Sequence, residues 1–490
     1  MALVKLELPP GVYSHGTDYQ SSGRWHDSNL VRWEGKSIRP ISGWQVRHTE
    51  ATTEPPRGAL VWLDNDHDPH IAMGDANALY TITSGGNITD ITPTAGLAVG
   101  YPDATEIVGF GGKPFGTGFF GIQRPTDGVL GDATTWSLAN FGEYLIACSS
   151  ADETIYEYIL TGVAEPVANA PTATSVVVTA ERFLFALGAG GIPRKVQWCD
   201  RENNTEWTPA ATNEAGDIEL QTNGEIMSGL QVRGRTLLLT TTDAHIATYS
   251  GPPTVYGFER VGVACGVISR MSGVAVSEGA FWMGEAGFYY FNGSSVEPIA
   301  CEVHDRVFFD LNRQQRSKVV VTHNSKYNEV WWFYPSEAST ENNRYVAYDY
   351  KENIWHIGAM SRTAACDVGV FTTPIWFGAD GTVYNHDLGY DYEGDTPYVE
   401  SGPVNIGNGD NVMHVTQMIP DEQTQGEVTA IFKTRFYPNG VERSYGPYSM
   451  SNPTSLRMTG RQIRVRLTGT ALTSWRIGTM RVDISQGGKR

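Results

Sequence analysis

The chain of 490 residues has few of the features that define membrane, secreted or metal-stabilised proteins. No run of about 18 apolar residues occurs, so no membrane span is predicted. The N-terminus, MALVKLELPPGVY, lacks the apolar core and cleavage site of a signal peptide, so we expect synthesis in a cytoplasm. The five cysteines are odd in number, widely spaced and never form CxxC. This pattern predicts buried free thiols and neither a disulfide framework nor a zinc site.

Charged residues are also scarce, at 18% of the chain, and stretches rich in Glu, Lys, Leu and Ala are few. Glycine (54 residues), tyrosine (23) and tryptophan (13) are abundant instead. This balance is typical of a turn-rich, all-β protein. The best helical candidate is 301–318, where four apolar side chains fall on one face: Val303, Val307, Phe308 and Leu311.

Motifs that carry catalysis are missing as well. GxSxG and HExxH do not occur, and GFGGKP and GAGGIP fit neither GxxxxGK[ST] nor GxGxxG. DNDHD (64–68) resembles the start of an EF-hand loop, but Pro69 and Asp75 stand where the loop needs glycine and glutamate, so we expect a solvated hairpin turn. The propellers of sialidases carry a repeated Ser-x-Asp-x-Gly-x-Thr-Trp turn. GDATTW (131–136) is the nearest approach, but it lacks the initial serine and the central glycine, and it does not recur. The histidines are scattered singly. The chain is therefore not expected to be an enzyme, and no cofactor or metal site is predicted.

A β-rich unit recurs roughly every 40 residues and closes each time on an aromatic residue, as in DETIYEYILTG and EAGFYYFNGSSVEPIA. A period of about 40–45 residues predicts a β-propeller, because a single four-stranded blade cannot bury both of its faces. We count about seven blades; six or eight also fit, because the fourth strands are poorly marked. The units are 57–93, 135–168, 174–209, 226–262, 268–300, 317–358 and 364–388.

The first and last units look incomplete, so we expect strands from the two ends of the repeat region to pair. The propeller then spans 57–390, with a Gly-rich loop inserted at 94–134 that is functional or interfacial in character. Residues 1–56 are expected to form an irregular lead-in. Residues 391–490 alternate polar and apolar side chains and predict a small β-sandwich-like domain.

The charge is unevenly distributed. The net charge is −18, yet residues 432–490 carry 11 Lys or Arg against two acidic residues, a net +9 that leaves −27 for residues 1–431. Acidity of this size argues against a protein that grips a DNA duplex, which needs a basic stripe over the phosphates.

Both ends of the chain hold candidate assembly residues. Tryptophan and arginine are typical interface anchors, and the lead-in concentrates Arg24, Trp25, Arg32 and Trp33. The alternative is that the lead-in wraps its own propeller and closes a blade.

In the C-terminal region the candidates are Arg461, Arg464, Arg466, Arg476 and Arg481. The spacing of RQIRVRL places Arg464 and Arg466 on one strand face, opposite three apolar residues: Ile463, Val465 and Leu467. The alternative is that these arginines face solvent or the acidic propeller.

Several segments resemble a known family. They are LPPGVYSHGTDYQSSGRWHDSNLVRW, RPISGW, QWCDRENNTEWTP, GRQIRVRLTG and WRIGTMRVDISQGGKR. Together they resemble structural proteins of the short tail of tailed bacteriophages, related in layout to packaged-DNA stabilisation, tail-hub or tail-nozzle proteins. The resemblance covers essentially the whole chain, and it is most specific at the two ends.

The resemblance implies a β-propeller virion protein that forms a ring, usually a homohexamer, below the portal and adaptor. Such a ring extends the DNA channel at the head–tail connector and helps to retain and then eject the genome. Implied partners are adaptor or connector proteins, tail fibre, spike or needle proteins, and double-stranded DNA that passes without sequence-specific binding. The implied location is the virion. An alternative function is a receptor- or glycan-binding propeller at the tail tip.

Overall fold

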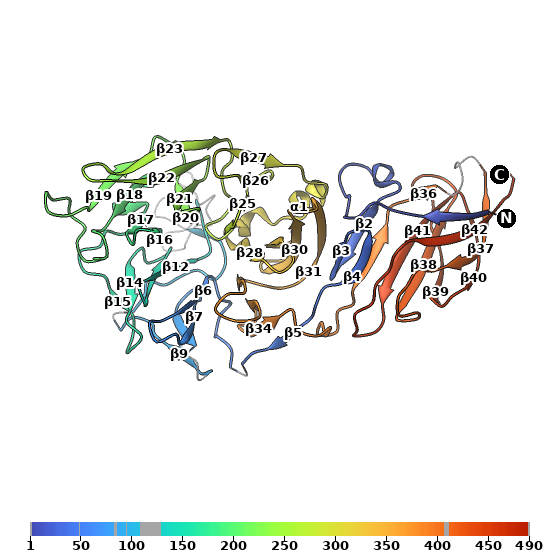
Figure 1. Ribbon diagram of the computed structural model, residues 1–490, viewed down its shortest axis with the longest axis horizontal. Coiled ribbons are helices and arrows are strands. Elements are labelled where there is room, and N and C mark those ends of the chain that lie inside the picture. The colour runs from blue at the N-terminus through green and yellow to red at the C-terminus, as the bar shows by residue number, and fades with distance from the viewer. Residues whose placement is uncertain are drawn as a thin grey trace, which may run out of the picture.

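The computed structural model describes residues 2–48, 50–82, 86–94, 96–107, 129–405 and 411–488. The protein is all-β, with 48% of residues in strands and 4% in helices. Figure 1 shows an elongated molecule with many sheets at one end and both termini at the other. The Gly-rich core of the expected loop, GFGGKPFGTGFFG (109–121), lies outside the described residues.

Eight of the described sheets consist of four antiparallel strands each; seven of them cover the repeat region, and the strands of the first six of these follow one another along the chain. We number these sheets one to seven in sequence order. Sheet one consists of β6 (Ala59–Leu63), β7 (Pro69–Gly74), β8 (Leu79–Ile82) and β9 (Ile88–Asp90). Sheet two consists of β12 (Trp136–Phe141), β13 (Tyr144–Ser149), β14 (Ile155–Tyr158) and β15 (Glu165–Pro166). Sheet three consists of β16 (Ser175–Val178), β17 (Leu184–Leu187), β18 (Lys195–Trp198) and β19 (Gly216–Glu219).

Sheets four to seven follow the same plan. Sheet four consists of β20 (Ile226–Val232), β21 (Arg235–Thr240), β22 (Asp243–Gly251) and β23 (Val255–Val263). Sheet five consists of β24 (Gly273–Val276), β25 (Gly279–Met283), β26 (Phe288–Phe291) and β27 (Val296–Ile299). Sheet six consists of β28 (Val320–Asn324), β29 (Glu329–Pro335), β30 (Asn342–Asp349) and β31 (Ile354–Ala359). Sheet seven consists of β32 (Ala364–Cys366), β33 (Ile375–Phe377), β34 (Val383–His386) and β5 (Trp44–Val46).

The fourth strand of sheet seven comes from the N-terminal part of the chain. Its register pairs Tyr384 with Val46 and His386 with Trp44. Strand β5 lies in the segment expected to be the lead-in, so the last sheet is completed by a strand that precedes the predicted repeat region, and β34 has no open edge. The first strands of successive sheets contact one another from β6 through β32, and β32 contacts β6.

The sheets pack on one another through apolar side chains. Every residue of β29 is buried, so this strand is covered on both faces. Trp331 and Phe333 from β29 pack against Trp376 of sheet seven, with ring centroids 5.5 Å and 5.3 Å apart. Such aromatic contacts between neighbouring sheets explain why each unit of the repeat carries aromatic residues.

The N-terminal segment was expected to be irregular, and the structure differs. It contains β1 (Ala2–Leu6), the 3₁₀ helix η1 (Asp18–Ser21), β2 (Trp25–Asn29), β3 (Val31–Glu34), β4 (Ser37–Pro40) and β5. Strands β3 and β4 form a hairpin, but β1, β2 and β5 pair with strands from the C-terminal third of the chain. A local pattern cannot reveal partners so distant in sequence.

Two further sheets lie at the end of the molecule that carries both termini (Figure 1). Their C-terminal strands are β35 (Tyr398–Ser401), β36 (Val404–Asn405), β37 (Met413–Ile419), β38 (Val428–Arg435), β39 (Arg443–Ser449), β40 (Thr454–Gly460), β41 (Gln462–Gly469) and β42 (Met480–Gln486). One sheet has the order β1-β42-β37-β40; the other has the order β2-β35-β41-β38-β39, with β36 also paired to β41. Met418 and Ile484 of the first sheet share a core with Phe432 and Val465 of the second.

Helix is scarce in the described chain. The helix expected at 301–318 forms as α1 (His304–Asp310) followed by the 3₁₀ helix η3 (Arg313–Lys318), and all four predicted apolar residues are buried. The remaining elements are η2 (Ala189–Gly191) and the pair β10 (Thr105–Ile107) and β11 (Val129–Gly131), which belong to the inserted segment. None of the helices described has the length and apolar character needed to span a membrane.

Candidate functional site

The N-terminal assembly candidates are engaged within the chain itself. Trp25 and Trp33 are each only 5% exposed and belong to the largest hydrophobic core. Arg24 donates to Glu302 over 2.7 Å and lies over the ring of Tyr13. The indole rings are therefore not available to a partner in this conformation, which favours the alternative that the segment wraps its own sheets.

Arg32 forms a buried ion pair with Glu329, which opens β29. Arg32 Nη2 donates to Glu329 Oε2 over 2.9 Å, and its guanidinium lies 3.5 Å from the centre of the Tyr327 ring. Trp331 Nε1 donates to the same carboxylate oxygen over 2.9 Å, and His356 Nε2 lies 3.5 Å from the other oxygen. Burial alone would raise the pKa of Glu329, but the Arg32 charge and these hydrogen bonds outweigh it and lower the pKa to about 2.

The predicted alternation in β41 is confirmed. Ile463, Val465 and Leu467 are buried, whereas Arg464 and Arg466 are partly exposed on the other face. This alternation follows from the period of two along a strand.

Neither of these two arginines is an uncompensated charge, however. Arg464 pairs with Asp18 of η1 and with Glu442, the latter at 3.0 Å. Arg466 pairs with Glu400 at 3.3 Å and stacks over Tyr398 at 3.6 Å. Both side chains thus help to fix neighbouring parts of the same chain.

The other three C-terminal candidates differ in their surroundings. Arg461 stacks over Tyr437, and Arg476 is exposed and pairs with Glu34. Arg481 is exposed and lies directly across from Lys5, its neighbour on β1. No salt bridge involves Lys5 or Arg481 within the described residues. Like charges on directly opposed residues are unfavourable, so this pair is suited to an acidic partner.

A shallow cavity of about 340 Å³ adjoins this pair and is lined by Lys5, Arg481, Ile419, Asp421 and Thr479. The Asp421 carboxylate accepts the backbone N–H of Thr479 over 3.1 Å, so it is partly committed to holding its own turn. We refer to Lys5 and Arg481 with this cavity as the basic patch.

The first strands of the seven sheets contain no Asp, Glu, Lys or Arg. Their sequences are ALVWL, WSLANF, SVVV, IMSGLQV, GVAV, VVTHN and AAC. Because these strands contact one another in succession, neighbouring sheets meet there along segments that lack Asp, Glu, Lys and Arg.

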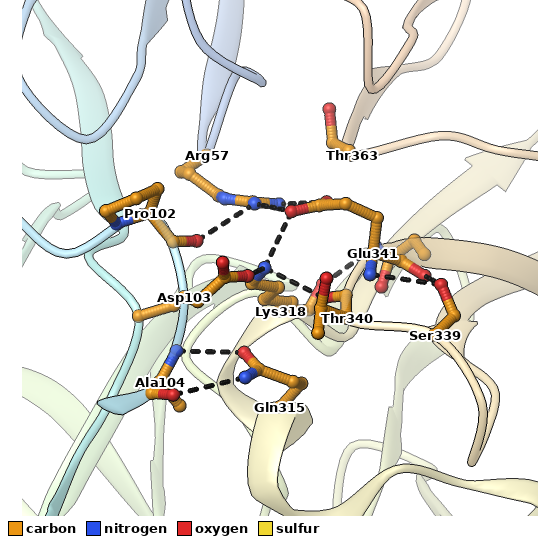
Figure 2. Close-up of polar contacts among 12 residues, drawn as sticks. Arg57, Pro102, Asp103, Ala104, Gln315, Lys318, Ser339, Thr340, Glu341 and Thr363 are labelled. Atoms are coloured by element: carbon orange, nitrogen blue, oxygen red, sulfur yellow. Dashed lines mark hydrogen bonds and ion pairs between the residues drawn. The ribbon is translucent and has the colours of Figure 1, made fainter. Parts of the chain in front are cut away.

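Charged groups gather where two of these strands begin (Figure 2). Arg57 precedes β6 and Lys318 precedes β28, and both side chains are essentially fully buried. Glu341 accepts from both cations, with Lys318 Nζ at 2.6 Å, and Asp103 of the inserted segment also pairs with Lys318. Two buried cations are thereby balanced by two carboxylates, as buried charges require.

Further hydrogen bonds attach the inserted segment to the same place. Gln315 exchanges two hydrogen bonds with the backbone of Ala104, at 2.9 Å and 3.2 Å, as Figure 2 shows. Ser317 Oγ accepts the N–H of Ala133 over 3.1 Å. The inserted segment is thus attached, through Ala104 and Ala133, to η3, which precedes sheet six. No local sequence signal identifies this network, because its members are up to 284 residues apart.

Two smaller expectations concern turns and thiols. The 64–68 segment is a turn between β6 and β7, in which the Asp64 carboxylate accepts the N–H groups of Asp66 and Asp68. This confirms a hairpin turn. All five cysteines are free, and burial raises the pKa of Cys148 and Cys199 to about 12, so these thiols stay protonated at neutral pH.

No protein-family model and no curated protein sequence matches the chain. Among solved structures, virginiamycin B lyase from Staphylococcus aureus is similar with a TM-score of 0.43 and 8% identity, covering 70% of this chain and 98% of the lyase. BamB from Moraxella catarrhalis is similar with a TM-score of 0.39 and 9% identity, over 73% of this chain and 94% of BamB. Similarities with such low identities and TM-scores say nothing about the activity of the present chain.

Proposed function

We propose that this protein is a structural component of a bacteriophage short tail that assembles as a ring and extends the DNA channel. The observation that carries the proposal is the separation of charge along an elongated chain. The two-sheet end carries the basic patch, and residues 391–490, which supply most of its strands, hold 11 Lys or Arg against 10 Asp or Glu, a net +1, whereas residues 1–390 carry −19. The proposal also agrees with the family resemblance of the two chain ends.

Charge separation favours head-to-tail contacts between copies. A basic surface at one end of the molecule that meets an acidic surface on the next copy is a heterologous contact. Repeated heterologous contacts generate a closed ring when the rotation between copies closes. A homohexamer, the usual state of the proteins that the chain resembles, is one such ring.

We also propose that sheets one to seven are the blades of a single closed propeller. The contacts of successive first strands and the pairing of β34 with β5 support this. Sheets that pack face to face lie about 10 Å apart, so seven first strands enclose a backbone ring roughly 23 Å across, which side chains narrow to roughly half. An opening of this width along the propeller axis is too narrow for a DNA duplex. The DNA channel would therefore lie between copies of the protein rather than through one propeller.

The oligomeric state of the purified chain tests the proposal. We expect light scattering after size-exclusion chromatography to give a mass of several copies at low salt, and negative-stain images to show rings with an axial hole. Arg481→Glu should reduce the fraction of protein in rings. Lys36→Glu reverses the charge of a side chain that is 81% exposed and should not reduce this fraction. A monomer at every salt and protein concentration would contradict the proposal.

One groove favours the alternative of glycan binding. It lies between sheets five and six, has a volume of about 540 Å³, and its lining includes Tyr290, Tyr350, Glu278, Glu297 and Asn353. Aromatic rings beside carboxylate and amide groups suit sugar rings, whose apolar faces stack while hydroxyls hydrogen-bond. A glycan array tests this: binding lost in Tyr350→Ala would support an adhesin, and no binding would leave the tail-channel proposal as the single candidate.

A further inference from the structure

Three side chains that can ligate a metal meet where the N-terminal segment lies against α1. His15 precedes η1, while His304 and Asp305 open α1. His15 Nδ1 is 3.1 Å and His304 Nδ1 is 3.2 Å from Asp305 Oδ1. The two imidazole rings are edge to face, with centroids 5.8 Å apart. Among the described residues this is the single group of three or more such ligands.

The outer atoms of this group are already held by the backbone. His304 Nε2 lies 3.2 Å from the carbonyl oxygen of Ala286, which can only accept, so Nε2 carries the proton. The N–H of Gly16 donates to Asp305 Oδ2 over 2.7 Å, so the other oxygen, Oδ1, is the one that faces the two imidazoles. Bonds of this kind from a carbonyl and a backbone amide orient the ligands of metal sites.

The contact between His304 Nδ1 and Asp305 Oδ1 then lacks a donor, although His15 Nδ1 can donate to the same oxygen. With its proton on Nε2, neutral His304 presents the Nδ1 lone pair to Asp305 Oδ1, which is also an acceptor. Two acceptors at 3.2 Å need a cation between them, either an additional proton on the imidazole or a metal ion.

The spacing fits a metal ion. Ligand atoms lie about 2.0–2.1 Å from Zn²⁺, so neighbouring ligands of a tetrahedral site are about 3.3 Å apart. The separations of 3.1 Å and 3.2 Å approach this value, and all three ligand atoms lie within 4.8 Å of one another. Two imidazoles and one carboxylate suit Zn²⁺ and similar ions, whereas Ca²⁺ and Mg²⁺ select oxygen ligands.

We propose that His15, His304 and Asp305 bind a divalent transition-metal ion, with Zn²⁺ as the representative, and that water occupies the fourth position. The His15 side chain is 53% exposed, which gives the ion a path from solvent. The ion would join the N-terminal segment to α1, beside the hydrogen bond from Ser14 N–H to the Glu302 carbonyl.

Metal titration of the full-length chain tests this site. After chelator treatment, Co²⁺ should bind with one-to-one stoichiometry and give the intense visible bands of a tetrahedral complex, and Zn²⁺ should displace it. His15→Ala and Asp305→Asn should each weaken binding by at least the roughly 10–100-fold that the loss of an outer-shell partner costs, because each removes a direct ligand. Asp305→Asn retains an acceptor for Gly16, and His15 is exposed, so both variants should fold. His26→Ala is the matched control, because His26 contacts Tyr13 in the same segment but is outside the group.

Two results would overturn the proposal. One is the absence of tetrahedral Co²⁺ bands in the wild-type protein, which would mean that a proton alone bridges His304 and Asp305. The other is equal affinity in the wild type, His15→Ala and Asp305→Asn. Binding that these two variants lose and His26→Ala retains supports the site.

Discussion

Replacing Glu329 with glutamine removes the charge partner of Arg32 while preserving side-chain shape. The glutamine oxygen can still accept the hydrogen bond from Trp331, so packing around β29 should persist. Arg32 can still donate to the glutamine oxygen and lies over the face of Tyr327, but it is left as a cation without a charge partner in the pair and with only 4% of its side chain exposed. The experiment therefore isolates the charge of the pair rather than its volume.

The expected loss is about 3–5 kcal/mol, the cost of removing one partner of a buried ion pair. We expect the lower value, about 3 kcal/mol, because the Tyr327 ring offers about 2 kcal/mol of cation–π stabilisation to a desolvated guanidinium. Replacing Arg32 by methionine in the same chain removes the stranded cation, so the double variant should recover most of the loss. The two substitutions should thus be strongly non-additive.

Thermal unfolding followed by tryptophan fluorescence measures this effect. At about 2.1 cal/mol/K per residue, cooperative unfolding of the whole chain has an entropy near 1 kcal/mol/K, so a loss of about 3 kcal/mol lowers the midpoint by about 3 °C. Glu7→Gln is the control, because it removes the exposed pair with Lys36 and should change little. Equal midpoints for Glu329→Gln and Glu7→Gln would refute the reasoning, as would additive single substitutions.

Four further outcomes are expected. Because the pKa of Glu329 is lowered from 4.5 to about 2, its ionised form stabilises the fold fully above pH 4.5, and this stabilisation is lost as the pH falls towards 2. An acid titration of Glu329→Gln should lack this loss of about 3 kcal/mol. Deleting 364–388 removes the strands that pair with β5 and should leave a protease-sensitive chain; a soluble, resistant product would contradict this role. Lys5→Glu should reduce ring formation, measured by light scattering, as Arg481→Glu does. Unchanged assembly would show that the basic patch is not a contact between copies. Duplex DNA should bind weakly at physiological salt; tight binding with a steep salt dependence in a titration would instead indicate a clamp.

The sheets could be predicted from the sequence because strands and turns are marked by residues that are close together in the chain. GRTLLLTTTDAHIATY (234–249) combines two runs of β-forming residues with a polar turn, and it corresponds to β21 and β22. Likewise, the alternation in RQIRVRL correctly separated buried from exposed residues of β41. In both cases the information lies within a few residues.

The packing partners of strands and the ion-pair partners of charged side chains could not be predicted from local sequence in the same way. Trp25 and Trp33 have the composition of interface anchors, yet they are buried because β2 and β3 pack in the chain's own core. Arg464 looked like a free charge because Asp18, its partner, is 446 residues away. The histidines appeared single for the same reason, since His15 meets His304 only after folding.

The N-terminal segment emerges as the part that joins the two ends of the molecule. It supplies β1 and β2 to the terminal sheets and β5 to sheet seven, and between them Arg32 is tied to β29. The orientation of the basic patch relative to the acidic sheets therefore depends on these internal contacts as well as on surface charge. If ring closure requires a defined rotation between copies, loosening the Arg32–Glu329 pair should impair assembly even though neither residue reaches the surface. Glu329→Gln should then yield open or irregular oligomers in negative stain at temperatures where the sheets remain folded, and normal rings would show that the segment does not set the rotation.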